Sequence, residues 1–257
     1  MKIYRVPISG MKLSSMPEDE RVFFIQAARL ADDLSFLRKL LYFASGKSEV
    51  KEEQRGLFTQ HIFVARILVG TLSEGWEVLQ KSFFNKLEPE NESSVAKRYE
   101  PLLKESVKSD LQELKQYFNG NNNIIKKIRN QFAYHYDKNK IREELSSVCS
   151  ESHYDIYLAK AHGNSLYGIA QEITGEALLR CIKDIAQVDD NKKAYDQLFL
   201  DVLSVSENFL SVLGDCLRLI VERHLGQEFE NAEKIDVGES VNIDDIRLPF
   251  FVEPPAK

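Results

Sequence analysis

One short segment of this chain concentrates side chains that can bind a phosphate and move a proton. It reads IKKIRNQFAYHYDK over residues 125–138. An imidazole exchanges a proton near neutral pH, and a guanidinium binds a phosphate through two parallel hydrogen bonds. Arg129 and His135 are therefore candidates for cleaving RNA without a metal ion. The arginine would stabilise charge on the phosphate, and the histidine would act as general acid or base.

The charge around this segment differs from that of the whole chain. With 34 basic and 40 acidic residues, the protein has a net charge of −6, which gives no global attraction to nucleic acid or an anionic membrane. Residues 126–142 reverse this balance, because six basic side chains stand there against Asp137 alone. We therefore expect a local phosphate-binding patch. The side chains expected to bind RNA, by charge or by stacking on a base, are Lys126, Lys127, Tyr134, Tyr136 and Lys138.

The hydrophobic pattern predicts that long helices position this segment. Apolar residues recur at alternating steps of four and three in runs that begin at Phe23, Phe58, Val107 and Tyr195. This spacing places one apolar stripe along each helix, as in a bundle with shallow crossing angles. The loops at residues 45–46 and 119–121 favour an all-α antiparallel bundle over a free coiled coil.

A short helix is predicted to carry the start of the motif. Asn122 or Asn123 can cap a helix that begins near Ile124, since an asparagine side chain accepts a hydrogen bond from the first turn. On a regular helix Arg129 and His135 would lie about 120° apart, so they converge only if His135 lies at or past the helix end.

Two further features complete the predicted organisation. Residues 155–161 and 165–170 flank His162-Gly163-Asn164 and predict a small β-hairpin inserted into the bundle. We expect residues 1–226 to form one helical domain that includes this hairpin. Residues 227–257 read as an acidic, proline-containing C-terminal tail that is extended and ends in a short apolar clip.

The string RNQFAYHYD, residues 129–137, resembles the motif of the HEPN superfamily (higher eukaryotes and prokaryotes nucleotide-binding domain) in its R-N-x-x-x-[FY]-H-Y-D variant. The resemblance implies an all-helical, metal-independent endoribonuclease that needs no cofactor and leaves a 2′,3′-cyclic phosphate. Arg129 would bind the scissile phosphate, His135 would be the general acid/base, and Asn130 would orient the pair. It also implies a homodimer with the active site at its interface, and a toxin or anti-phage effector with an antitoxin or defence-system partner.

A second set of polar residues is predicted to support the motif. Arg66, Ser73 and Glu77 follow one another at helical spacing and would act together with Asp137; the alternative is an exposed helix flank. The alternative for the motif itself is that Arg129 pairs with an acid and His135 merely ends a helix. The protein would then be a non-catalytic module of HEPN shape for dimerisation or for binding a protein or nucleotide.

Several functions are disfavoured by what the chain lacks. The sequence contains no Walker, Rossmann, H-E-x-x-H, G-x-S-x-G or Glu-x-x-His motif. No secretory signal or membrane span is apparent, and the three cysteines are widely spaced, so we expect a cytoplasmic protein with free thiols. A metal could still be held by His153 and His162, but surface polar residues near a turn are the simpler interpretation.

Overall fold

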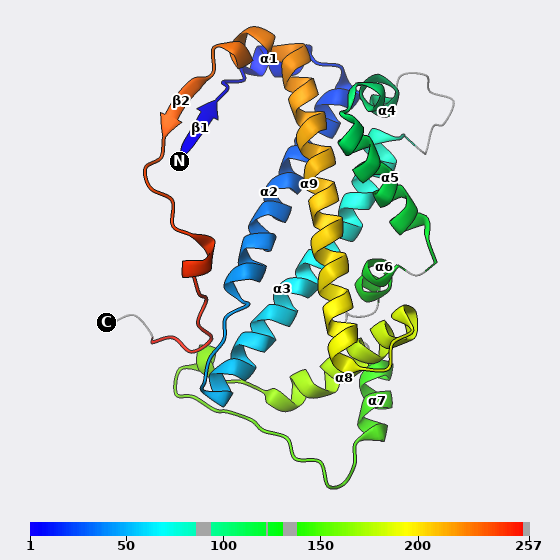
Figure 1. The fold of residues 1–257 in the computed structure, drawn as a ribbon, viewed down its shortest axis with the longest axis vertical. Coiled ribbons are helices and arrows are strands. Elements are labelled where there is room, and N and C mark those ends of the chain that lie inside the picture. Colours follow the sequence, from blue (N-terminus) through cyan, green and yellow to red (C-terminus); the bar gives the residue numbers. More distant parts are fainter. Residues whose placement is uncertain (86–93, 122, 131–137, 254–257) are drawn as a thin grey trace. The chain divides into compact units, whose positions relative to one another are not determined.

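The protein is mostly helical, with long packed helices and one small two-stranded sheet (Figure 1). This computed structural model describes residues 1–85, 94–121, 123–130 and 138–253, except the side chains of Lys140, Ser147 and His162. The predicted helical class is confirmed.

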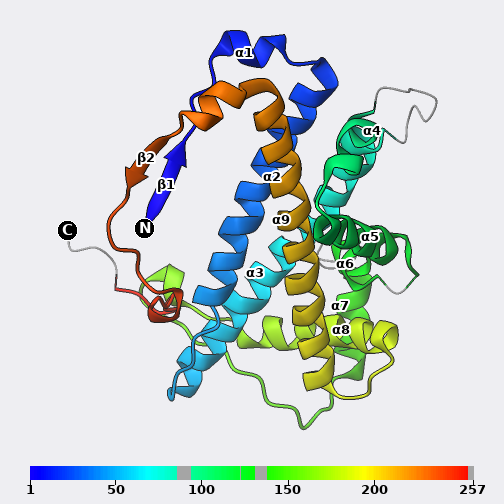
Figure 2. The ribbon, with the colours of Figure 1, turned by 45° about the horizontal axis from the view of Figure 1, so that its top comes forward.

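The described helices and strands follow the chain in the order seen in Figures 1 and 2. The α-helices are α1 (Gly10–Ser15), α2 (Glu18–Phe43), α3 (Lys51–Val78), α4 (Val95–Tyr99), α5 (Glu105–Asn119), α6 (Ile124–Ile128), α7 (Lys138–Ser147), α8 (Gly168–Ala186) and α9 (Asn191–Glu230). A short π-helix at Leu79–Phe83 extends α3, and short 3-10 helices lie at Glu100–Leu102, His162–Asn164 and Ile243–Asp245. The strands are β1 (Lys2–Arg5) and β2 (Glu233–Asp236).

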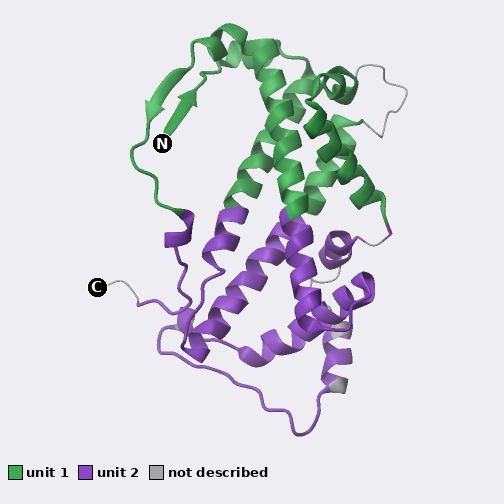
Figure 3. Ribbon diagram, viewed as in Figure 1, with its two compact units in different colours: residues 1–36, 71–120, 204–242 green, residues 37–70, 121–203, 243–257 purple. Residues whose placement is uncertain are grey.

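The chain divides into two compact units, coloured separately in Figure 3. Unit 1 comprises residues 1–36, 71–120 and 204–242, and unit 2 comprises residues 37–70, 121–203 and 243–257. Each of the long helices α2, α3 and α9 is divided between the two units. The predicted motif segment belongs to unit 2.

The core of unit 1 follows the predicted apolar stripes. Gly75 of α3 lies where α2 and α9 approach, since a Cβ atom there would lie 2.9 Å from Leu30 and 3.3 Å from Phe209. Trp76 is buried and stacks on Phe118 of α5, with 4.9 Å between the ring centroids. Trp76 therefore belongs to the core of unit 1.

The small sheet joins two segments that are far apart in the sequence. Strands β1 and β2 pair antiparallel, with Lys2 opposite Asp236 and Arg5 opposite Glu233. Arg5 also donates a hydrogen bond to the Glu233 carboxylate at 3.3 Å. Both strands are short and almost wholly exposed, so neither carries the alternating apolar pattern that indicates a strand. This sheet was not predicted.

The predicted β-hairpin does not form as a pair of strands. One antiparallel bridge remains, in which Tyr157 and Leu166 exchange backbone hydrogen bonds of 2.8 Å. The second predicted strand ends early because α8 begins at Gly168. The first is held by a side chain instead, since Arg55 of α3 donates a 2.8 Å hydrogen bond to the Tyr157 hydroxyl and pairs with Asp155.

The C-terminal segment is more ordered than the predicted extended tail. Helix α9 continues to Glu230, and β2 follows it. The predicted apolar clip packs on unit 2: the Leu248 N–H donates to the Phe43 carbonyl at 3.1 Å, and Val252 exchanges two hydrogen bonds with the Asn164 side chain, at 2.6 and 3.0 Å. The ring of Phe250 lies against Gly56 on α3.

We expect Gly56→Ala to release this clip. The added Cβ would lie 2.4 Å from Cγ and 2.6 Å from Cβ of Phe250, atoms too near the backbone to swing aside. Phe250 is half-buried, so losing the burial of its ring, worth about 1.4 kcal/mol, should raise the open fraction roughly tenfold. Chymotrypsin should then cleave after Phe250 or Phe251 about ten times faster, as measured by mass spectrometry under conditions where cleavage follows the open fraction.

Gly10→Ala provides the matched control for this substitution. A Cβ at Gly10 would meet nothing within 4 Å, so cleavage of the clip should match the wild-type rate. Equal rates for Gly56→Ala and wild type would contradict the docking of Phe250.

Candidate functional site

Helix α6 positions the first half of the motif. The Asn123 side chain caps it by accepting a 2.9 Å hydrogen bond from the Lys126 N–H, which confirms one of the two predicted caps. One side of α6 is buried through its three isoleucines, Ile124, Ile125 and Ile128. Lys126 and Lys127 are exposed, so the helix is anchored by its apolar side and presents positive charge on the other.

The structure brings two predicted site residues together just after α6. The Arg129 guanidinium donates a 3.1 Å hydrogen bond from Nη1 to the Asn130 side-chain oxygen. Arg129 is half-buried and Asn130 is exposed. The side-chain oxygen of Asn130 therefore contacts one edge of the guanidinium, and the predicted role of Asn130 in orienting Arg129 and His135 stays a prediction.

The remaining predicted motif residues lie outside the described part of the chain. They are Tyr134, His135, Tyr136 and Asp137. Their predicted roles as general acid/base, base-stacking residues and supporting carboxylate stay predictions. Lys138, the predicted phosphate-binding residue after them, is the first residue of α7 and is exposed.

Helix α8 supports both sides of the motif segment. Helices α6 and α7, which precede and follow residues 131–137, each pack on α8 within unit 2. The α7–α8 contact includes an ion pair at 2.9 Å between Arg180 and the buried carboxylate of Glu144. The two ends of the motif segment are thus fixed to one helix.

The predicted supporting stripe on α3 is divided between the two units. Arg66 is half-buried and belongs to unit 2 with the motif, whereas Ser73 and Glu77 belong to unit 1. Glu77 is exposed and pairs with Lys81 one turn later, at 3.1 Å. The support of these residues for Arg129 and His135 stays a prediction.

A buried ionic cluster in unit 1 is absent from the sequence-based predictions. The Glu20 carboxylate of α2 is fully buried and accepts hydrogen bonds from the Tyr99 hydroxyl at 2.8 Å and from His224 Nε2 at 2.6 Å. Arg98 pairs with the same carboxylate at 2.6 Å, and Arg223 approaches it to 3.7 Å. The cluster joins α2, α4 and α9.

The electrostatics of this cluster favour a charged Glu20. Burial acts to raise the pKa of the carboxyl, but the hydrogen bonds from His224 and Tyr99, with the charges of Arg98 and Arg223, outweigh burial and lower it. Burial and the neighbouring carboxylate raise the pKa of Tyr99, so its hydroxyl stays a donor.

A periodicity signal could have revealed this cluster. Glu20 stands three residues before Phe23 and thus continues the apolar stripe of α2, while His224 stands four residues after the buried Ile220. A charged or titratable side chain at a core position needs a partner. The position of His224 near the end of its helix predicts only an interaction with that helix end.

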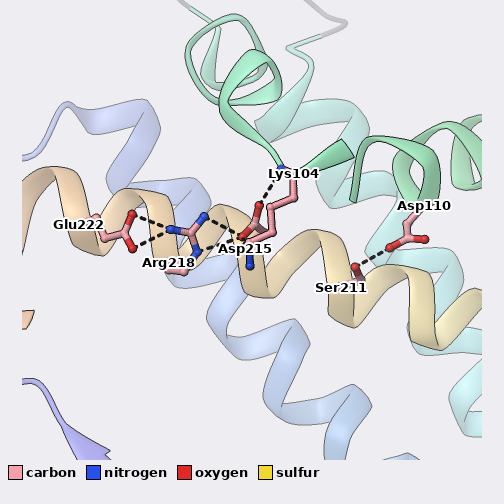
Figure 4. Close-up of polar contacts among 6 residues, drawn as sticks. All are labelled: Lys104, Asp110, Ser211, Asp215, Arg218 and Glu222. Atoms are coloured by element: carbon pink, nitrogen blue, oxygen red, sulfur yellow. Dashed lines mark hydrogen bonds and ion pairs between the residues drawn. The ribbon is translucent and has the colours of Figure 1, made fainter. Parts of the chain in front are cut away.

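A second polar network holds α5 against α9, as Figure 4 shows. Asp215 accepts hydrogen bonds from the Lys104 backbone N–H at 3.2 Å and from Arg218 at 2.8 and 3.0 Å. Burial acts to raise the pKa of Asp215, but these donors outweigh burial and lower it. One turn before Asp215, the Ser211 hydroxyl donates to Asp110 of α5. These contacts fix helices and present no reactive group.

Other candidate chemistry finds little support in the described residues. No three His, Cys, Asp or Glu side chains in this part of the chain gather as a metal site. The Nδ1 atom of the exposed His153 lies 2.7 Å from the Glu151 carbonyl, and the His162 side chain is outside the described residues. The cysteines are free, and burial raises the pKa of Cys216 to about 12, which makes its thiol a poor nucleophile. None of the described helices is both long and apolar enough to cross a membrane.

Comparison with known proteins provides no relative. No protein-family model, curated protein or solved structure matches the chain. Residues 129–137 and the helices that flank them are therefore the basis for inferring a function.

Proposed function

We propose that this protein is a metal-independent endoribonuclease of HEPN type, built on an antiparallel bundle of helices. The observation that supports it most directly is the hydrogen bond between Arg129 and Asn130 at the end of α6. This pair follows two exposed lysines in an otherwise acidic protein. An oriented guanidinium beside positive charge is suited to an RNA phosphate.

The proposed chemistry is an internal transfer at the scissile phosphate. The ribose 2′-oxygen attacks phosphorus as its proton passes to an imidazole, and Arg129 stabilises charge on the non-bridging oxygens. The new 2′-O–P bond forms as the P–O5′ bond breaks, and the leaving 5′-oxygen takes up a proton. The products are a 2′,3′-cyclic phosphate and a 5′-hydroxyl. His135 is the proposed general acid/base.

The proposal includes a homodimer in which two copies of the motif face one cleft. One His135 could then remove a proton while its counterpart supplies one. It also includes action in the cytoplasm as a toxin or anti-phage effector with a partner protein that controls it. These points follow from the family resemblance of residues 129–137.

The experiment that tests the proposed function maps the ends of cleaved RNA. Purified protein is incubated with total tRNA, with and without EDTA, and the new termini are sequenced after selective ligation of cyclic phosphates. We expect new 2′,3′-cyclic phosphate ends at equal yield in both samples. Cleavage that EDTA abolishes, or new 3′-hydroxyl ends, would contradict the mechanism. Intact tRNA would favour the non-catalytic binding module.

A further inference from the structure

The C-terminal clip, residues 246–253, is held on unit 2 in the way that a groove holds a separate peptide. Two side-chain amides contact its backbone. Asn164 exchanges two hydrogen bonds with Val252, and Gln60 of α3 donates one from Nε2 to the Pro249 carbonyl at 3.2 Å. Between these contacts the Phe250 ring lies against Gly56. Main-chain hydrogen bonds together with a place for one side chain are the usual means of binding a linear peptide.

The contact between Gln60 and the clip is only half made. The Oε1 atom of Gln60 is buried and accepts no hydrogen bond from the described part of the chain. Asn164, in contrast, donates to the Val252 carbonyl and also accepts from the Val252 N–H. The same double contact is closed to Gln60, because Pro249 has no backbone N–H. A buried acceptor without a donor is costly, so a peptide that supplies this N–H should bind better than the clip does.

The clip does not fill the groove. A cavity of about 580 Å³ adjoins Phe250, and its lining includes Gln60, Phe63 and Leu145. Phe63 and Leu145 are exposed, and Phe250 is itself only half-buried. Residues 237–245, which connect β2 to the clip, are exposed as well. The clip can therefore leave the groove at low cost, and a peptide with better contacts can displace it.

We propose that this groove binds a linear apolar peptide of another protein, with an N–H at the position of Pro249 and a phenylalanine at that of Phe250. The N–H donates to Gln60 Oε1, and the aromatic ring replaces that of Phe250 against Gly56. A second copy of this chain fits less well, because it brings the same proline. The clip acts as an internal competitor of the partner. The site is separate from the proposed ribonuclease chemistry and does not depend on it.

Two peptides of residues 246–253 test the proposal, one with Pro249→Ala and one with N-methylalanine at the same position. They share every side chain and differ in the N–H. Fluorescence anisotropy measures their binding to the full-length Phe250→Ala protein, whose own clip has lost its anchor. The alanine peptide should bind about tenfold more tightly, a factor that corresponds to about 1.4 kcal/mol. Equal affinity, or binding of neither peptide at millimolar concentration, would overturn the proposal.

Two further variants, each combined with Phe250→Ala, identify the acceptor of the N–H. Gln60→Met removes the amide at similar length, so the two peptides should bind this protein with equal affinity. Gln26→Met changes an exposed glutamine on unit 1 and should preserve the tenfold difference. Circular dichroism confirms that each variant is folded. A tenfold difference that persists in folded Gln60→Met protein would overturn the proposal, since another group would then accept the N–H.

The wild-type protein tests the competition by the clip. It should bind the alanine peptide about tenfold more weakly than the Phe250→Ala protein does, because its own clip occupies the groove in most molecules. Equal affinity of the two proteins would show that the peptide and the clip use different surfaces, and would also overturn the proposal.

Discussion

Replacing His135 with alanine should lower the rate of RNA cleavage by about 10²–10⁴ and leave the protein folded. The imidazole is the proposed group that exchanges a proton near neutral pH, and alanine cannot replace it. Arg129→Ala should cause a loss of the same order, because removing a guanidinium leaves charge on the phosphate unstabilised in the transition state. Single-turnover cleavage of a tRNA substrate gives both rates.

Controls for these substitutions lie in the same unit. His153→Ala removes another histidine, which is exposed and has its Nδ1 atom 2.7 Å from the Glu151 carbonyl, so the cleavage rate should stay at the wild-type value. Lys127→Ala removes an exposed charge and should weaken RNA binding and reduce the salt dependence of that binding. The rate at which bound RNA is cleaved should change little. A His135→Ala protein that cleaves at the wild-type rate would refute the assignment.

Asn130→Ala should distinguish orientation from charge. The Asn130 side chain holds one terminal nitrogen of Arg129, so its loss should reduce cleavage less than the loss of Arg129 itself. An Asn130→Ala protein as slow as Arg129→Ala would instead assign the amide a direct contact with RNA. Circular dichroism at 222 nm verifies that the helices of each variant are intact.

Local patterns in the sequence were enough to predict most of the helices. A helix is stabilised by contacts between residues three and four positions apart, so its apolar stripe is visible without knowledge of its neighbours. The start of α6 was predictable for the same reason, because the Asn123 cap acts within three residues. The Arg129–Asn130 contact likewise joins neighbours in the chain.

Features that depend on distant residues were not predictable in this way. Strands β1 and β2 lie more than 200 residues apart, and their exposed side chains give no apolar alternation. The hairpin failed for a related reason, since the residues after Leu166 fit either a strand or the start of α8. The proposed support of Arg129 by α3 required tertiary contacts that helical spacing does not specify.

Replacing Glu20 with glutamine should destabilise unit 1 by about 3 kcal/mol. Glutamine keeps the shape and can still accept a hydrogen bond, but it leaves the positive charges of Arg98 and Arg223 without their buried partner. This loss is at the lower end of the range for broken buried pairs, because Arg223 is half exposed and water can solvate it. Glu18→Gln changes an exposed acid on the same turn of α2 and should alter stability by less than about 0.5 kcal/mol.

Trp76 allows this effect to be measured in unit 1 alone. It is the only tryptophan of the chain, it is buried, and it belongs to the same unit as Glu20. Urea unfolding followed by its fluorescence should therefore report the loss in Glu20→Gln, whereas circular dichroism reports both units. Matching midpoints for wild type and Glu20→Gln in the fluorescence curve would show that the buried carboxylate adds no net stability.

The pH dependence of this difference has a definite sign. The pKa of Glu20 in the folded protein lies below its ordinary value of 4.5, so the ionised carboxylate adds stability above that value. This contribution is lost as the pH falls from 4.5 through the lower folded pKa. The stability gap between wild type and Glu20→Gln should thus be constant near neutral pH and shrink in acid. A gap that widened on acidification would mean that Glu20 is protonated in the fold, and that His224 and the two arginines do not hold it as a carboxylate.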